Sequence, residues 1–220
     1  PRVVAKGEED RVGSAGVRRV FTLMLPAVFG VSVAQINLLV NTILASFLVT
    51  GSVSWLYYSD RLMEFPLGVF GIALATVILP ALSTQVAGNS TGIYFRTIDW
   101  ALGLVMIVTI PAMVALASLA YPLMVVLFNY GEFSSHDALM ASYSLMAFSP
   151  GLLGFVMVKV LAPGFYARKD TRTPVRVGMV AMLVNALAAG VLTLVFQLGH
   201  VGLALATSIS GLLNALLLYH

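Results

Sequence analysis

The chain has 220 residues, of which 60% are hydrophobic and only 10% are charged, whereas a soluble domain carries about 25% charged residues. A soluble globule of this size would expose apolar patches far larger than monomers tolerate, which excludes an ordinary soluble enzyme, a disordered chain and a nucleic-acid-binding protein. The net charge of +3 fits loop charges at a membrane surface, and the absence of cysteine excludes disulfides and thiolate metal sites.

Five long stretches without Asp, Glu, Lys or Arg predict membrane-spanning helices, because a helix needs about 20 apolar residues to cross the hydrocarbon core. A turn signal at Leu198–Gly202 divides the last stretch into two spans. The sequence therefore predicts an all-α, polytopic membrane protein with a linker over residues 1–19 and a six-helix lobe over 20–220. The expected helices are at about 20–48, 55–83, 98–122, 138–163, 175–197 and 201–220.

Lysine and arginine fall in alternate loops of this arrangement. The leading segment, the second-to-third loop and the fourth-to-fifth loop hold all of these residues except Arg61 and Lys159, which fall within spans. Since positively charged loops remain in the cytoplasm, both ends of the chain are expected there. The chain starts without Met in a charged stretch and has no basic tail, so we expect a segment of a larger membrane protein.

The second predicted span begins with YYSDRLMEF, which places Asp60, Arg61 and Glu64 within about one helical face. A charge at a helix centre costs ~2.5–3.5 kcal/mol on insertion scales, so an intramembrane charge indicates a functional site. An arginine flanked by carboxylates can stay charged in a hydrated cavity, and its fork fits phosphate oxygens. The alternative is that water solvates these charges at the outer interface, where Trp55 and Tyr57 would form part of an aromatic belt.

Other polar residues within spans allow two interpretations each. Asn37 and Asn41 lie on one face of the first span, either to hydrogen-bond a neighbouring helix or to form a polar cavity wall. Lys159 lies about one turn before the exit of its span and is expected to extend to the cytoplasmic surface rather than bind a ligand. No HExxH, Walker motif or catalytic constellation is present, so we expect a protein that is not an enzyme.

Two long motifs resemble signatures of the MurJ (MviN) lipid II flippase family, within the MOP exporter superfamily. They are VTGSVSWLYYSDRLMEFPLGVFGIALATVILPALS, from Val49, and VKVLAPGFYARKDTRTPVR, from Val158. The resemblance implies the second lobe, helices seven to twelve, of a fourteen-helix transporter in the bacterial inner membrane. It also implies two pseudo-symmetric lobes around a central cavity and a substrate, lipid II, that joins an undecaprenyl chain, a pyrophosphate and a glycopeptide.

Under this resemblance, the functionally important arginine of the family motif falls on Arg61, with Asp60 and Glu64 beside it. A sodium site reported for some members uses polar residues of the first and fifth spans of this lobe. Asn41 and Asn185 are the candidates here, although no acidic residue accompanies them in those spans. Other metal ligands stay unknown.

The resemblance implies that lipid II moves from the cytoplasmic to the periplasmic leaflet by alternating access. The expected partners are lipid II, membrane lipids and the remaining transmembrane helices of the longer protein, with no nucleic acid. No ATP site is visible, so the membrane potential or a monovalent cation is the expected energy source, without any other cofactor. Two alternatives are a related MOP exporter of another lipid-linked oligosaccharide or drug, and a membrane scaffold without transport.

Overall fold

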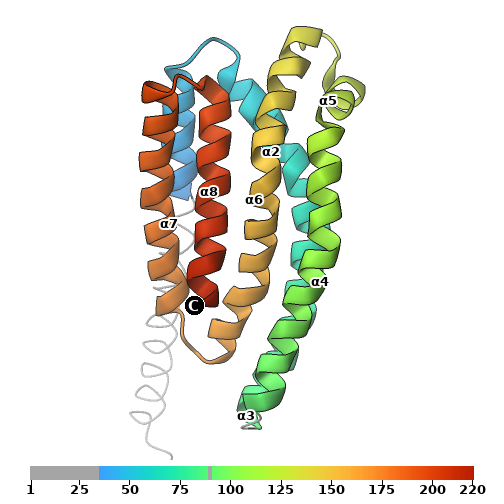
Figure 1. The fold of residues 1–220 in the computed structure, drawn as a ribbon, viewed down its shortest axis with the longest axis vertical. Helices are drawn as coiled ribbons and strands as arrows, with labels where there is room; N and C mark the ends of the chain where they lie inside the picture. Colours follow the sequence, from blue (N-terminus) through green and yellow to red (C-terminus); the bar gives the residue numbers. More distant parts are fainter. Residues whose placement is uncertain (1–34, 89–90) are drawn as a thin grey trace, which may run out of the picture.

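The computed structural model describes residues 35–88 and 91–220, and the regular structure within these residues is entirely helical (Figure 1). In this part of the chain, 5 helices are long and apolar enough to cross a membrane, and a shorter apolar helix, Gln35–Ser46, precedes them. The long helices are Ser52–Ala87, Gly92–Ser118, Ser135–Ala167, Arg172–Val195 and Gly199–Tyr219. The prediction of an all-α, multi-pass membrane protein is therefore confirmed.

The linker predicted over 1–19 and much of the first span, predicted over 20–48, lie outside the described residues. The helix Gln35–Ser46 is the part of that span which the structure describes, so the six-helix lobe stays a prediction. Each of the other predicted spans corresponds to a described helix that begins earlier in the sequence than expected. The difference arises because polar residues flanking the apolar stretches are also helical.

The first long helix is a continuous rod in three parts. Helix α2 (Ser52–Pro66) passes into a π-helical turn, η1 (Leu67–Ile72), and then into α3 (Ala73–Ala87). Pro66 has no N–H to donate to the preceding turn, and a wider helical turn directly after it accommodates the lost hydrogen bond. The rod therefore contacts α6 through a locally widened turn, in which Gly71 is buried.

The next segment differs from its predicted form. Helix α4 (Thr91–Ser118) ends at a break at Leu119, and a separate helix, α5 (Ala120–Phe128), follows where the sequence predicted one span over 98–122. Helix α6 (Ser135–Ala167) begins with a capping box. The backbone N–H of Asp137 donates to Ser134 Oγ at 3.2 Å, and the N–H of Ser134 donates to Asp137 Oδ2 at 2.9 Å. Two donors at the helix start are satisfied in this way.

The last part of the chain comprises α7 (Arg172–Gly190), a π-helical turn η2 (Val191–Val195) and α8 (Gly199–Tyr219). Asp170 caps α7, because its carboxylate accepts hydrogen bonds from the N–H of Arg172 at 3.0 Å and from the N–H and hydroxyl of Thr173 at 3.1 and 2.6 Å. These hydrogen bonds, with the one from the hydroxyl first, hold the pKa of Asp170 below its ordinary value.

Helix α6 is the centre of the bundle and contacts α2, α3, α4, α5 and α8. In Figure 1 it runs between α8 on one side and α4 on the other. It approaches α8 so closely that a Cβ added at Gly154 would lie 2.5 Å from the carbonyl carbon of Gly211. At the same interface the hydroxyl of Ser208 donates to the carbonyl of Ala147 at 2.6 Å. Small residues allow this approach, and close packing is what holds helices together in lipid.

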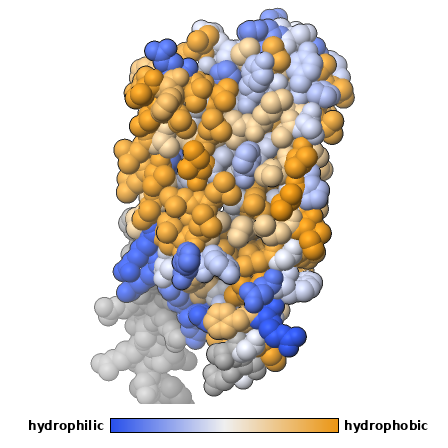
Figure 2. All heavy atoms as spheres, in the orientation of Figure 1, coloured by the Kyte–Doolittle hydropathy of each residue, from blue (hydrophilic) through white to orange (hydrophobic). Residues whose placement is uncertain are grey.

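Hydrophobic side chains cover much of the sides of the bundle, and polar ones gather toward its two ends (Figure 2). We call one end of the bundle the basic end. Arg168 and Lys169 lie there in the connection between α6 and α7, and Arg172 and Arg176 lie in the first two turns of α7. The described connections at the opposite end, 47–51, 129–134 and 196–198, contain no lysine or arginine. This distribution matches the alternation of charge that the sequence predicted.

Candidate functional site

The charged cluster predicted on the second span lies on α2. Arg61 is nine residues, about 14 Å, from the start of this helix at the opposite end of the bundle. Its Nη1 donates to Glu64 Oε2 at 2.6 Å, the one ion pair within the part of the chain that the structure describes. The guanidinium carbon of Arg61 also lies 4.9 Å from the centre of the Tyr57 ring, one turn earlier. The structure therefore holds Arg61 between an aromatic ring and a carboxylate.

The side chains of Arg61 and Glu64 are 53% and 48% exposed, and Asp60 beside them is partly buried. Glu64 engages one nitrogen of the guanidinium, which leaves the other N–H donors available to water or to an anion. None of these three residues lines the large cavity of the described chain. The cluster thus forms a charged patch on an outer face of the lobe, with the donor geometry that binds phosphate oxygens.

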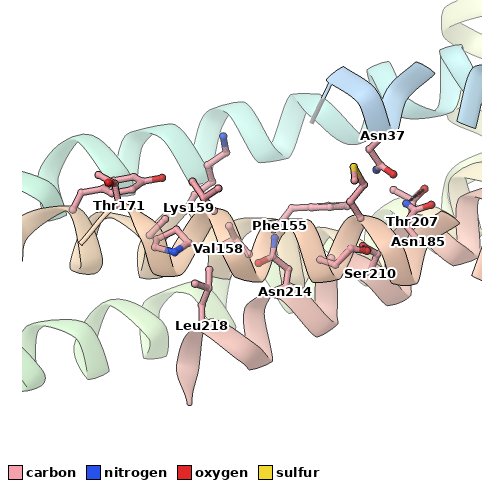
Figure 3. A pocket seen from close by; sticks show the side chains of 18 residues that line it. Asn37, Phe155, Val158, Lys159, Thr171, Asn185, Thr207, Ser210, Asn214 and Leu218 are labelled. Carbon is pink, nitrogen blue, oxygen red and sulfur yellow. Dashed lines mark hydrogen bonds between the residues drawn. The ribbon is translucent and has the colours of Figure 1, made fainter. Parts of the chain in front are cut away.

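A cavity of about 710 Å³ lies between the helix Gln35–Ser46, α6, α7 and α8 (Figure 3). Its polar lining is mostly neutral, and Lys159 is the only charged residue among the described residues that line it. Among the described residues, the buried side-chain oxygens of Asn37, Asn185 and Asn214 have no hydrogen-bond partner. Most buried polar groups in folded proteins are hydrogen-bonded, so water or a polar ligand would satisfy these oxygens. Asn37 therefore lies in a cavity wall, as one of its two predicted roles requires.

Asn41 and Asn185, the two candidates for a cation site, both hydrogen-bond to a third residue, Thr207. The Nδ2 groups of Asn41 and Asn185 each donate to Thr207 Oγ1 at 3.3 Å, and this hydroxyl donates to the carbonyl of Leu203 at 2.9 Å. The Oδ1 atoms of both asparagines have no hydrogen-bond partner in the part of the chain that the structure describes. Sequence reasoning missed Thr207, and the only signal was one more hydroxyl in the apolar run LALATSISG.

The donor set of Asn41, Asn185 and Thr207 consists of neutral oxygens. An asparagine amide can be turned by half a rotation without changing its outline, and in that orientation both Oδ1 atoms would face Thr207. Among the described residues, no group of three or more His, Asp or Glu could hold a metal ion. Neutral oxygens suit a weakly held monovalent cation, whereas zinc and other transition metals prefer imidazole, thiolate or carboxylate ligands.

Lys159 lies in α6, eight residues before its last residue, or about 12 Å from the basic end. An ideal Cβ at Gly71 would be 3.3 Å from Lys159 Cγ and 3.7 Å from its Cβ, so the lysine stem crosses η1 at this glycine. In Figure 3 its amine is directed toward the neighbouring helix and not along α6 toward Thr171. Lys159 is exposed, as its predicted extension to the surface requires, and its stem also contacts η1 and lines the cavity.

Residues 9–220 match the family model described as lipid II flippase MurJ. The chain is 57% identical over 205 residues to the "Probable lipid II flippase MurJ" of Vibrio cholerae serotype O1, covering 93% of this chain and 38% of that protein. It is 43% identical over 204 residues to the "Lipid II flippase MurJ" of Burkholderia cenocepacia, covering 93% of this chain and 39% of that protein. The chain therefore spans about two fifths of the length of these curated relatives.

Solved structures show the same relationship in three dimensions. The fold matches a lipid II flippase MurJ in an inward closed conformation with a TM-score of 0.81 and 31% identity, over 92% of this chain and 42% of that one. An outward-facing MATE multidrug transporter of the MOP superfamily, 17% identical with a TM-score of 0.75, shares the fold over 89% of this chain and 42% of its own.

Proposed function

This chain belongs to the lipid II flippase MurJ family, and we propose that it is one lobe of a transporter for lipid II. In the proposed reaction an undecaprenyl-pyrophosphate glycopeptide moves from the cytoplasmic to the periplasmic leaflet of the bacterial inner membrane. No covalent bond is made or broken in this movement, so it needs binding groups and a change of access rather than catalytic residues. Family membership over residues 9–220 supports the substrate class.

The observation that carries the proposal on this chain is the placement of Arg61. A guanidinium that is 53% exposed on a membrane-spanning helix is unfavourable against acyl chains, so we expect a hydrated cavity in front of it. A pyrophosphate crossing about 30 Å of hydrocarbon loses its water, and cationic donors on its path replace that hydration. The undecaprenyl chain can stay in lipid throughout.

We propose that the remaining helices of the full-length protein cover the face that carries Arg61. Relatives are more than twice as long as the chain, which leaves room for a first lobe opposite α2. Rocking of one lobe against the other would then expose Arg61 to the two leaflets in turn, as in other transporters built from two repeats. We place the basic end in the cytoplasm, because its arginines and lysines follow the positive-inside rule.

The proposed energy source is the membrane potential, worth ~2.3 kcal/mol per charge per 100 mV, or a monovalent cation. The support for a cation is that Asn41 and Asn185 both hydrogen-bond to Thr207, while their buried Oδ1 atoms lack partners among the described residues. This group connects the helix Gln35–Ser46 to α7 and α8, so an ion held there would join three helices. Binding of the ion would then favour one packing of these helices over another.

The test is lipid II binding and growth complementation by the full-length protein with Arg61→Ala and Arg61→Lys. We expect Arg61→Ala to abolish complementation and weaken binding, and Arg61→Lys to restore part of both, because lysine keeps the charge but not the bidentate fork. An excess of a polyprenyl-linked sugar without a glycopeptide should not compete. Unchanged binding and growth with Arg61→Ala would remove Arg61 from the mechanism, and equal competition would favour another lipid-linked oligosaccharide as substrate.

A further inference from the structure

Lys159 is a cation without a counterion in the described structure. The ion pair of α2 joins Arg61 to Glu64, but within residues 35–88 and 91–220 no carboxylate lies at ion-pair distance from Lys159. The carboxylate of Asp170, beyond the end of α6, is engaged by the start of α7. A lysine about 12 Å inside a membrane-spanning helix carries an energetic cost that water or an anionic ligand has to offset.

The direction of Lys159 is set by its contact with η1. Its Cγ would be 3.3 Å from a Cβ at Gly71, so the absence of a side chain there gives the lysine stem its path across the rod. Helical turns of this wide type are rare and are frequent at functional sites. Gly71 is ten residues after Arg61 on the same rod, which separates the two levels by about 15 Å along the helix. Arg61 therefore lies on the rod and Lys159 lies beside it, nearer the basic end.

The cavity beside Lys159 has a mostly apolar lining that contains a few polar groups. Its volume of about 710 Å³ falls within the range of small-molecule sites, roughly 300–1,000 Å³. Asn185 is fully buried in its wall, and within residues 35–88 and 91–220 the Oδ1 atoms of Asn185, Asn37 and Asn214 have no hydrogen-bond partner. These oxygens accept hydrogen bonds from O–H or N–H groups, whereas Lys159 attracts an anion. The complementary ligand carries an anionic group with hydroxyl or amide donors near it.

We propose that Lys159 is a second anion-binding residue of the transporter and receives the lipid-linked diphosphate on the cytoplasmic side, before Arg61. This inference rests on the proposed function and adds a residue to it. The diphosphate would engage Lys159 at the level of Gly71 while the sugar or peptide donors face the amide oxygens. It would then pass along α2 to Arg61, about two to three helical turns farther from the basic end.

The experiment measures binding to the full-length protein in nanodiscs with undecaprenyl diphosphate, uncharged undecaprenol and inorganic diphosphate as probes. The variants are Lys159→Gln and Lys159→Arg, and the matched control is Arg176→Gln, which removes an exposed cation from the basic end. We expect Lys159→Gln to weaken undecaprenyl diphosphate binding about tenfold or more, as loss of a hydrogen bond to a charged group does. Undecaprenol binding should not change. Lys159→Arg should recover most of the affinity, and the control should match the wild type.

A second variant keeps the inference testable if Lys159→Gln fails to fold. Gly71→Val keeps the lysine charge but blocks the path of its stem, so it should also weaken diphosphate binding, with undecaprenol binding as the measure of folding. Equal diphosphate affinity in the wild type and in Lys159→Gln would overturn the inference. Lysine-dependent binding of inorganic diphosphate as tight as that of the lipid would also overturn it, in favour of a site for the free anion. If the wild type does not prefer undecaprenyl diphosphate to undecaprenol, the proposed function itself fails.

Discussion

The indole Nε1 of Trp55 donates a hydrogen bond of 2.8 Å to Oδ1 of Asp137, which joins α2 to the first turn of α6. The sequence suggested Trp55 as part of an interfacial belt, but its side chain is 5% exposed and lies inside the bundle. The ring of His200 packs at 4.8 Å from the indole, and His136 lies at 6.1 Å. Asp137 thus caps α6 with one oxygen and holds α2 with the other. The opposite end of the bundle is therefore fixed around one buried indole.

We expect Trp55→Phe to destabilise the protein by about 1.5–3 kcal/mol, because it removes a hydrogen bond to a charged acceptor. The chain offers a matched control, since its other tryptophan, Trp100, is 63% exposed and Trp100→Phe should have little effect. Thermal unfolding of both variants in the same detergent would measure the difference. Equal stability of the two would mean that the bond to Asp137 contributes nothing to the folded state.

The contact of α6 with α8 gives a second prediction. Gly154→Ala places a methyl group 2.5 Å from the backbone of Gly211, where no side chain can move away, so the two helices have to separate. We expect a loss of about 1–3 kcal/mol of stability, as in other overpacked interiors. Gly103→Ala is the control, because nothing lies within 4 Å of its added Cβ. A Gly154 variant as stable as the Gly103 variant would contradict the close approach of α6 and α8.

The cap of α7 predicts a stability that depends on pH. The folded-state pKa of Asp170 lies below its ordinary value, so its contribution is complete above that value and is lost as the pH falls through the lowered one. Asp170→Ala should cost about 1 kcal/mol at neutral pH, a normal value for a helix cap. The stabilities of the variant and the wild type should converge in acid, once the pH falls below the lowered pKa of Asp170. A gap of the same size at both pH values would show that the charge of Asp170 is not responsible.

The length and continuity of apolar runs predicted most of the fold, because a span across lipid needs a minimum number of apolar residues and little else. The same criterion cannot detect a break inside an apolar run. Leu119 separates α4 from α5 inside an apolar run, where Pro122 has no N–H to donate to the carbonyl of Ser118, the last residue of α4. Nor does this criterion set the ends of helices. The capping box of Ser134 and Asp137 starts α6 at Ser135, three residues before the predicted start of the span.

Site residues were predictable where their charge alone identifies them. They were less predictable where contacts between helices determine the partners of a side chain. Asp60, Arg61 and Glu64 lie together on α2 because helical spacing is local. Lys159 was expected to extend to the surface and is exposed, but the sequence does not show that its stem contacts Gly71 on another helix. Thr207 was missed because a hydroxyl in an apolar run usually bonds its own helix. Only the packing of three helices brings two asparagines to it.

The group at Thr207 predicts a cation effect on stability. If a monovalent cation binds there, sodium should stabilise the full-length protein relative to choline at equal ionic strength, because a ligand that binds only the folded state raises its stability. Asn185→Ala should remove this difference, whereas Asn214→Ala should keep it, since Asn214 lines the same cavity and, among the described residues, makes no hydrogen bond to Thr207. Thermal unfolding in the two salts is the measurement. A sodium effect that survives in Asn185→Ala would place the ion elsewhere.

The ion pair of α2 gives the last prediction, which concerns the carboxylate and not the arginine. Glu64 Oε2 occupies a donor of Arg61 at 2.6 Å and adds a negative charge where a diphosphate has to bind. Both side chains are about half exposed, so the pair itself contributes at most about 1 kcal/mol. We therefore expect Glu64→Gln to tighten binding of undecaprenyl diphosphate by no more than about fivefold, since it frees the fork and removes repulsion. Arg61→Ala should abolish that gain in the double variant, and undecaprenol binding should stay constant. Weaker diphosphate binding by Glu64→Gln would instead mean that the carboxylate orients Arg61 toward the ligand.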